Sequence, residues 1–122
     1  DGTEQPFQTA ANGKLKNYTL VVLINKGSAS ASEILAGALR DNRGVTVVGE
    51  TSFGKGSVQE LAELPQKASL KITIAKWLTP KGESIDENGI KPDIEVKLTE
   101  EDIKAEKDPQ LDKALELIKN LR

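Results

Sequence analysis

Hydrophobic and polar positions along this chain predict short strands separated by one long helix and followed by another. The apolar run at residues 18–24 is nearly continuous, as expected of a strand buried on both faces. Residues 31–42 then follow helical spacing, with one predicted face formed by Ala31, Ile34, Leu35, Ala38 and Leu39. Gly44 is a helix-ending signal, and residues 45–48 predict a second buried strand. A strand–helix–strand unit of this length is typical of a right-handed parallel crossover, which makes the fold class α/β.

The second half of the chain predicts shorter extended segments. Residues 57–64 fit a strand or a short helix, and residues 69–77 alternate like a strand with one wet face. Pro92 confines the extended segment at 90–96 to a sheet edge. Near the N-terminus, Asn12-Gly13 predicts a hairpin turn that follows an edge strand at 7–10.

A second amphipathic helix is predicted at the C-terminal end of the chain. Asp108 is placed to cap it, with Pro109 at its first position. Its predicted apolar face holds Leu111, Ala114, Leu115, Ile118 and Leu121. Upstream of it, the acidic run at 100–102 predicts the start of a short helix or a linker.

Composition narrows the function classes. The 122 residues suffice for one domain with a core, and no run approaches the roughly 18 apolar residues of a membrane span, which predicts a soluble chain. The net charge of −2 and the four aromatic residues argue against a nucleic-acid partner. With no cysteine and no histidine, the chain holds neither a thiol nucleophile nor a Ser-His-Asp triad, and no histidine-ligated zinc. A serine here can be activated only by a lysine or a carboxylate.

The candidate chemistry begins in the turn between the first strand and the helix. Ser28, Ser30 and Ser32 alternate with alanines there. A strand–turn–helix arrangement presents a hydroxyl at a helix N-terminus, where free N–H groups and the helix dipole favour negative charge. A purely structural interpretation is also open, because Ser30 and Glu33 fit the S-x-x-E capping box.

The glycine-rich loop at residues 49–56 holds the second candidate, Lys55. The loop resembles the phosphate-binding pattern G-x-x-x-x-G-K-[ST], but Gly56 replaces the hydroxyl residue and no clear helix follows, which disfavours nucleotide binding. Lys55 could otherwise serve as a general base. That role needs an uncharged amine, whereas lysine ordinarily has a pKa of about 10.4, and burial is what shifts such groups. A solvated lysine in a glycine turn is the structural alternative.

Taken together, these stretches resemble the carboxyl-terminal (tail-specific) processing protease family, serine peptidases with a Ser-Lys dyad. The motifs that carry the resemblance occur in order between about residues 20 and 117, at 28–34, 49–50, 53–56, 58–59, 79–82, 88–94 and 108–114. The resemblance implies the C-terminal part of a ClpP/crotonase-like protease core, without a cofactor or metal. The acidic turn with Glu83, Asp86 and Glu87 does not match a calcium loop.

Residue by residue, the resemblance implies four roles. Ser30 matches the nucleophile and Lys55 the general base. Gln59 matches the glutamine that orients the lysine, and the Ala31 backbone N–H matches one oxyanion donor. If the serine turn matches the family motif in a different register, Ser28 or Ser32 is the alternative nucleophile.

The resemblance also implies what accompanies this chain. Residues 1–122 are expected to be a partial catalytic domain, cut from a longer protein whose upstream PDZ domain and N-terminal core segments are absent, and therefore weak or inactive alone. The parent is expected outside the cytoplasm, in the periplasm, cell envelope or plastid lumen, and to associate with membranes only through absent parts. Its expected substrates are proteins or peptides with apolar C-terminal tails. A non-catalytic binding module of the same fold remains the alternative.

Overall fold

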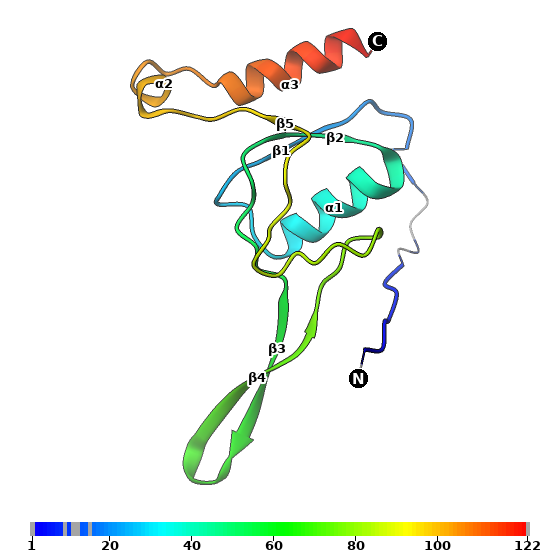
Figure 1. Ribbon diagram of the computed structural model, residues 1–122, viewed down its shortest axis with the longest axis vertical. Helices are drawn as coiled ribbons and strands as arrows, with labels where there is room; N and C mark the ends of the chain where they lie inside the picture. The colour runs from blue at the N-terminus through cyan, green and yellow to red at the C-terminus, as the bar shows by residue number, and fades with distance from the viewer. Residues whose placement is uncertain (1, 9, 11–12, 15, 122) are drawn as a thin grey trace.

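The computed structural model describes residues 2–8, 10, 13–14 and 16–121, and shows a small parallel sheet between helices with a hairpin extending from it (Figure 1). The elements run, in chain order, β1 (Val21–Ile24), α1 (Ala31–Arg43), β2 (Thr46–Gly49), β3 (Ser57–Leu64), the 3₁₀ turn η1 (Pro65–Lys67), β4 (Ala68–Lys76), β5 (Ile94–Glu95), α2 (Glu100–Lys104) and α3 (Pro109–Asn120). The mixed α/β class predicted from the sequence is confirmed.

The parallel sheet has the strand order β1-β2-β5. Val22 pairs with Val47 and Val48 pairs with Ile94, both in parallel register. α1 is the crossover between β1 and β2, and β5 lies at an edge, both as predicted. α3 contacts β1 and β2, and Figure 1 shows α3 and α1 on opposite sides of these strands. Two covering layers explain why β1 and β2 are apolar on both faces.

Helix α1 begins and ends at the residues that the sequence predicts, but its buried face differs from the prediction. Gly44 adopts the left-handed conformation, and its N–H donates to the carbonyls of Arg40 and Leu39 in the last turn. Glu33, Ala36 and Gly37 are buried, whereas two members of the predicted face, Ala31 and Leu35, are exposed.

The reason for this correction is the segment that covers the helix. A side chain at Gly37 would press on Thr79 and Ile90, so residues 79–90 approach α1 over its smallest residues. Ile85 and Ile90 complete the core cluster with Ile24, Ala36 and Val47.

β3 and β4 form an antiparallel hairpin that projects away from the sheet (Figure 1). The strand alternative for residues 57–64 is therefore the correct one. Every residue of β4 is exposed, so the prediction of one wet and one buried face is wrong for this structure. No second layer packs against the hairpin among the described residues. Apolar and polar residues alternate along its strands, so one apolar face is left uncovered.

The two ends of the chain differ in how well their patterns predicted structure. Phe7, Gln8 and Ala10 are in no strand, and Phe7 instead stacks obliquely on Trp77 with ring centroids 5.1 Å apart. Thr9 and Asn12 lie outside the described residues, whereas Gly13 has φ 59° and its carbonyl accepts the Lys16 N–H at 2.9 Å.

The C-terminal helix forms as predicted at its start but not on its whole apolar face. The Asp108 carboxylate accepts the N–H of Leu111, and Pro109 is the first residue of α3. Ala114 is buried, but Leu111 and Leu115 are each 44% exposed. Gln110 is buried instead, because its side chain donates to the Val96 carbonyl at 2.8 Å.

Candidate active site

Ser30 occupies a strained backbone position at the N-terminus of α1. It is the N-cap residue, with φ 57° and ψ −119°, a conformation that residues other than glycine rarely adopt. Such strain costs about 1–3 kcal/mol and is retained mainly where function needs it. A serine on a sharp, strained strand-to-helix turn is also how α/β-hydrolases expose a nucleophilic hydroxyl. The backbone therefore supports a role for Ser30 beyond capping.

The three serines of this turn differ in how their hydroxyls are used. Ser28 Oγ accepts the N–H of Asn25 at 3.1 Å, and Ser32 Oγ donates to the Ala29 carbonyl at 2.7 Å. Ser30 is exposed, and its side chain faces the Glu33 N–H of the capping box without forming a close hydrogen bond. Of the three, Ser30 is thus the hydroxyl that the turn leaves available.

The backbone N–H of Ala31 lies directly after this hydroxyl. Ala31 is the first residue of α1, and in the part of the chain that the structure describes its N–H has no hydrogen-bond acceptor. A free amide at the positive end of a 13-residue helix can stabilise an anion. This geometry is compatible with the oxyanion role implied for Ala31.

Lys55 lies in the loop between β2 and β3, with its side chain exposed. Gly54 has φ 88°, and a side chain at Gly56 would collide with the backbone of Asp86, so the glycines on either side of Lys55 do allow close packing. The close approach does not bury the amine, and among the described residues no hydrogen bond joins Lys55 Nζ to Ser30 Oγ.

One buried carboxylate joins the serine turn to the lysine loop. Glu33 is 0% exposed. Its Oε2 accepts the backbone N–H groups of Ser30 at 2.8 Å and Lys55 at 3.0 Å. Its Oε1 accepts the Ser52 hydroxyl at 2.5 Å and the Gly54 N–H at 2.7 Å. The capping pair predicted from the sequence is present, but Glu33 also binds a loop about 20 residues away.

The charge state of Glu33 follows from these bonds. Burial alone would raise the pKa of the Glu33 carboxyl, but the hydrogen bond from the Ser52 hydroxyl and those from three backbone amides outweigh it. The pKa therefore lies below its usual value, and Glu33 is ionised at neutral pH.

Gln59 is exposed on β3, and its amide lies toward the neighbouring strand. Gln59 Nε2 is 3.5 Å from Thr73 Oγ1, the residue paired with it on β4. No hydrogen bond between Gln59 and Lys55 occurs among the described residues. The orienting role of Gln59 accordingly stays a prediction.

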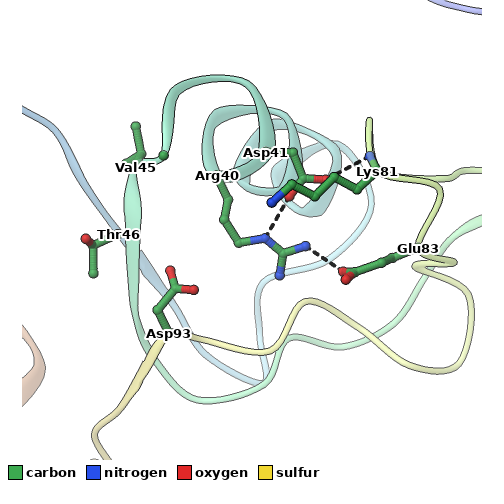
Figure 2. Close-up of a pocket in the computed structure, with 8 residues that line it drawn as sticks. Arg40, Asp41, Val45, Thr46, Lys81, Glu83 and Asp93 are labelled. Atoms are coloured by element: carbon green, nitrogen blue, oxygen red, sulfur yellow. Dashed lines mark hydrogen bonds and ion pairs between the residues drawn. The ribbon is translucent and has the colours of Figure 1, made fainter.

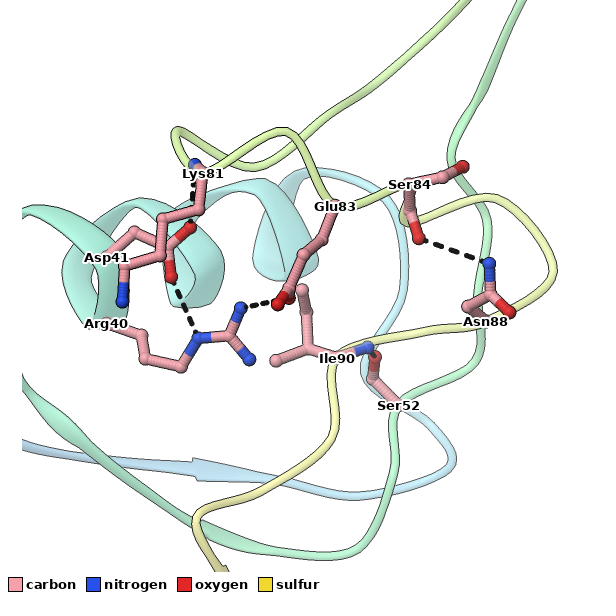
Figure 3. A network of polar contacts seen from close by, with 8 residues as sticks. All are labelled: Arg40, Asp41, Ser52, Lys81, Glu83, Ser84, Asn88 and Ile90. Atoms are coloured by element: carbon pink, nitrogen blue, oxygen red, sulfur yellow. Dashed lines mark hydrogen bonds and ion pairs between the residues drawn. The ribbon is translucent and has the colours of Figure 1, made fainter.

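Ser52 is a residue of this site that the sequence did not single out. It is 7% exposed, and its hydroxyl donates to Glu33. The same hydroxyl accepts the N–H of Ile90 at 2.6 Å (Figure 3). Phe53 adds a further link, because its N–H donates to the Ser28 carbonyl at 2.9 Å. No short sequence motif marks Ser52, since both of its partners are distant in the chain.

A hollow of about 420 Å³ lies near the other end of α1 (Figure 2). Arg40 there donates to the neighbouring Asp41 at 2.9 Å and to Glu83 at 2.6 Å. Asp41 also accepts the Lys81 N–H at 3.1 Å. α1 is about 20 Å long, so this hollow is remote from Ser30. These contacts of Arg40 and Asp41 brace the turn at residues 79–83 against the helix.

The loop at residues 49–56 also bears on nucleotide binding. A phosphate loop passes its phosphate to the N-terminus of a helix, but here the loop leads into strand β3. The structure thus contradicts the nucleotide-binding alternative.

A parallel α/β fold with a strained serine at a helix N-terminus and a lysine loop fixed to the same turn defines a core suited to a serine nucleophile. Comparison with known proteins agrees with this class. The model of peptidase family S41 matches residues 1–96, and the chain belongs to this family.

Several relatives are carboxyl-terminal processing proteases. The chain is 46% identical over 121 residues to the carboxyl-terminal-processing protease of Synechocystis sp., which covers 96% of this chain and 28% of that protein. It is 51% identical over 82 residues to the carboxy-terminal processing protease CtpB of Bacillus subtilis, which covers 67% of this chain and 17% of that protein. The chain thus spans under a third of the length of these relatives.

A solved structure shows the same fold. The photosystem II D1 C-terminal processing protease superposes with a TM-score of 0.63 and 42% identity, covering 66% of this chain and 21% of that one. The tricorn protease superposes with a TM-score of 0.70 at 22% identity, covering 84% of this chain and 10% of that one, a likeness of fold alone. In the part of the chain that the structure describes, no helix has the length and apolar character to cross a bilayer.

Proposed function

We propose that this chain is the part of a serine endopeptidase that carries the catalytic Ser-Lys dyad, with Ser30 as nucleophile and Lys55 as general base. The observation that carries the proposal is the strained, exposed Ser30, whose backbone amide shares one carboxylate oxygen with the amide of Lys55. Membership of peptidase family S41 supports the same reaction.

The bond-making and bond-breaking steps of the proposed reaction use the dyad, the helix end and water. Lys55 Nζ takes the proton of Ser30 Oγ as this oxygen attacks the peptide carbonyl carbon. The Ala31 N–H stabilises the oxyanion, a contribution of about 3 kcal/mol per donor in other enzymes. The C–N bond then breaks and Lys55 gives its proton to the leaving amine. Lys55 next deprotonates a water, which hydrolyses the acyl-serine, and returns the proton to Ser30.

The exposed Lys55 side chain sets a condition on this mechanism. A general base must be uncharged, and removal of surrounding water favours the uncharged amine. In our proposal bound substrate and the remainder of the catalytic domain cover Lys55. Gln59 then turns from Thr73 to the lysine and orients it.

The uncovered surface supports the proposal that residues 1–122 form only part of a catalytic domain. The apolar face of the β3–β4 hairpin is exposed, at 46% for Leu64, 50% for Leu70, 43% for Ile72 and 58% for Ile74. An exposed apolar face of this kind marks a contact surface. We assign the rest of the cleft, and a PDZ domain that binds substrate tails, to other parts of the longer protein.

The names of the relatives indicate the substrates and compartments of that longer protein. We propose protein substrates that are cut near apolar C-terminal tails. Chloroplastic and bacterial processing proteases are among the relatives, which supports a location in a plastid lumen, the periplasm or the cell envelope.

A serine-reactive fluorophosphonate probe tests the function directly. In the full-length protein we expect the probe to label Ser30, because the dyad activates this hydroxyl, and peptide mapping by mass spectrometry identifies the labelled serine. The matched control is the Ser30→Ala variant, which should not be labelled. Absence of labelling in a folded protein that binds peptides without cleaving them would instead favour a non-catalytic binding module.

The 122-residue chain by itself is expected to cleave peptides weakly or not at all. The physical reason is that the exposed Lys55 and the uncovered hairpin leave the proposed cleft open to water. The measurement is cleavage of an unstructured peptide with an apolar C-terminal tail, with the full-length protein assayed in parallel. Turnover by the chain comparable to that of the full-length protein would contradict the proposal that the domain is partial.

A further inference from the structure

We propose that Glu33 is a positioning residue: its buried carboxylate fixes the turn that carries Ser30 at one separation from the loop that carries Lys55. This inference rests on the proposed function, since it concerns how the two reacting side chains are held. The first observation is the burial of an ionised group. Glu33 is 0% exposed, and among the described residues no lysine or arginine forms an ion pair with it. A buried charge without a counter-ion is costly unless hydrogen bonds compensate it.

The compensation comes from both parts of the proposed dyad. Ser30 and Lys55 donate their backbone N–H groups to the same atom, Glu33 Oε2, at 2.8 and 3.0 Å. The two amide nitrogens consequently lie within two hydrogen-bond lengths of each other. The chain positions of the nucleophile and of the base are thereby set by a single oxygen.

The second carboxylate oxygen secures the loop that precedes Lys55. Glu33 Oε1 accepts from Ser52 Oγ and from the Gly54 N–H, and the same Ser52 hydroxyl accepts the Ile90 N–H. A capping box needs only the bond to Ser30. The three donors from residues 52–55 go beyond what a helix end requires.

The geometry separates positioning from chemistry. Glu33 contacts Lys55 through the backbone N–H, and the exposed lysine side chain forms no ion pair with it among the described residues. Glu33 therefore does not exchange a proton with the Lys55 amine in this arrangement. Displacement of a catalytic group by about 1 Å can cost about 100-fold in rate, so a residue that sets this separation affects kcat strongly.

Glu33→Gln in the full-length protein is the first test. A glutamine has nearly the same shape, but its NH₂ group must face one of the two pairs of donors that the carboxylate accepts, so at least one backbone N–H loses its acceptor. We expect kcat to fall about 100-fold with KM within about twofold, and the rate of Ser30 labelling to fall in parallel. Both are measured where circular dichroism shows the variant fully folded.

Asp102→Asn is the matched control. Asp102 is the N3 acid of the capping box of α2 and accepts the Thr99 N–H at 3.0 Å, the bond that Glu33 forms with Ser30. Asp102 has no partners in a distant loop among the described residues, so its loss removes only a cap. We expect kcat to be unchanged in this variant.

Ser52→Ala keeps the cap of α1 and removes one donor on the loop side. We expect it to lower kcat about tenfold, and it decides the question should Glu33→Gln fail to fold. Unchanged kcat in a folded Glu33→Gln variant, or in Ser52→Ala, would overturn the positioning role. Loss of Ser30 labelling in the unmodified protein would overturn the proposed function instead, so the two failures are distinguishable.

Discussion

Replacing Ser30 with alanine in the full-length protein is expected to lower kcat/KM for peptide cleavage by at least about 10³-fold while the protein stays folded. Alanine removes the hydroxyl that attacks the carbonyl and leaves the helix, the Ala31 amide and the Glu33 contacts in place, because these use backbone groups. Peptide cleavage followed by mass spectrometry measures the loss of kcat/KM, and thermal unfolding shows whether the variant stays folded.

Two neighbouring serines provide the controls for this result. Ser28→Ala and Ser32→Ala remove hydroxyls that bond to the local backbone, and we expect both variants to keep most activity. Full activity in Ser30→Ala together with loss in Ser28→Ala or Ser32→Ala would move the nucleophile to a rival serine.

Glycine at position 30 separates catalysis from strain. Ser30→Gly is expected to be as inactive as Ser30→Ala but about 1 kcal/mol more stable than it, because glycine adopts φ 57° without the steric penalty. Equal thermal stability of the two variants would show that the turn at Ser30 is not strained.

The second large effect is expected at Lys55. Lys55→Ala should lower kcat by about 10³-fold or more without unfolding the protein, because the exposed side chain contributes chemistry rather than packing. Steady-state cleavage rates measure the loss of kcat, and thermal unfolding shows whether the variant stays folded.

Two lysine variants decide what Lys55 does. Lys55→Arg keeps the positive charge but cannot act as a base, since a guanidinium does not deprotonate in proteins, so we expect it to be inactive. Activity in Lys55→Arg would mean that the residue acts as a cation. Lys26→Ala is the matched control, because Lys26 lies in the serine turn and its only ion pair in the described structure is a long one to Glu50, at 3.7 Å.

The helices show how far local patterns predict this fold. Asp108, Pro109 and Gly44 act on backbone groups within a few residues, and the helix ends that they mark are the observed ones. Leu35 and Leu111 were predicted to be buried and are exposed. Periodicity shows which residues share a face, but tertiary packing decides which face is covered, as the packing of residues 79–90 does for α1.

The candidate site shows the same division between local and distant information. The sequence indicated Ser30, Lys55, Gln59 and Ala31 through a family resemblance, and Glu33 as part of a capping box. It did not indicate Ser52 or the second set of Glu33 contacts. Hydrogen bonds between residues 19 to 22 positions apart leave no spacing rule in a sequence.

By itself, the sequence determined the strand–helix–strand unit, the helix caps and the exclusion of thiol and histidine chemistry, because these depend on residue type and on contacts between near neighbours. Only the tertiary structure decided that the Ser30 and Lys55 backbones meet on one buried carboxylate, that Ser30 is strained, and that Lys55 remains exposed. Those features depend on how distant segments cross, and burial and backbone torsion are set only when the segments pack together.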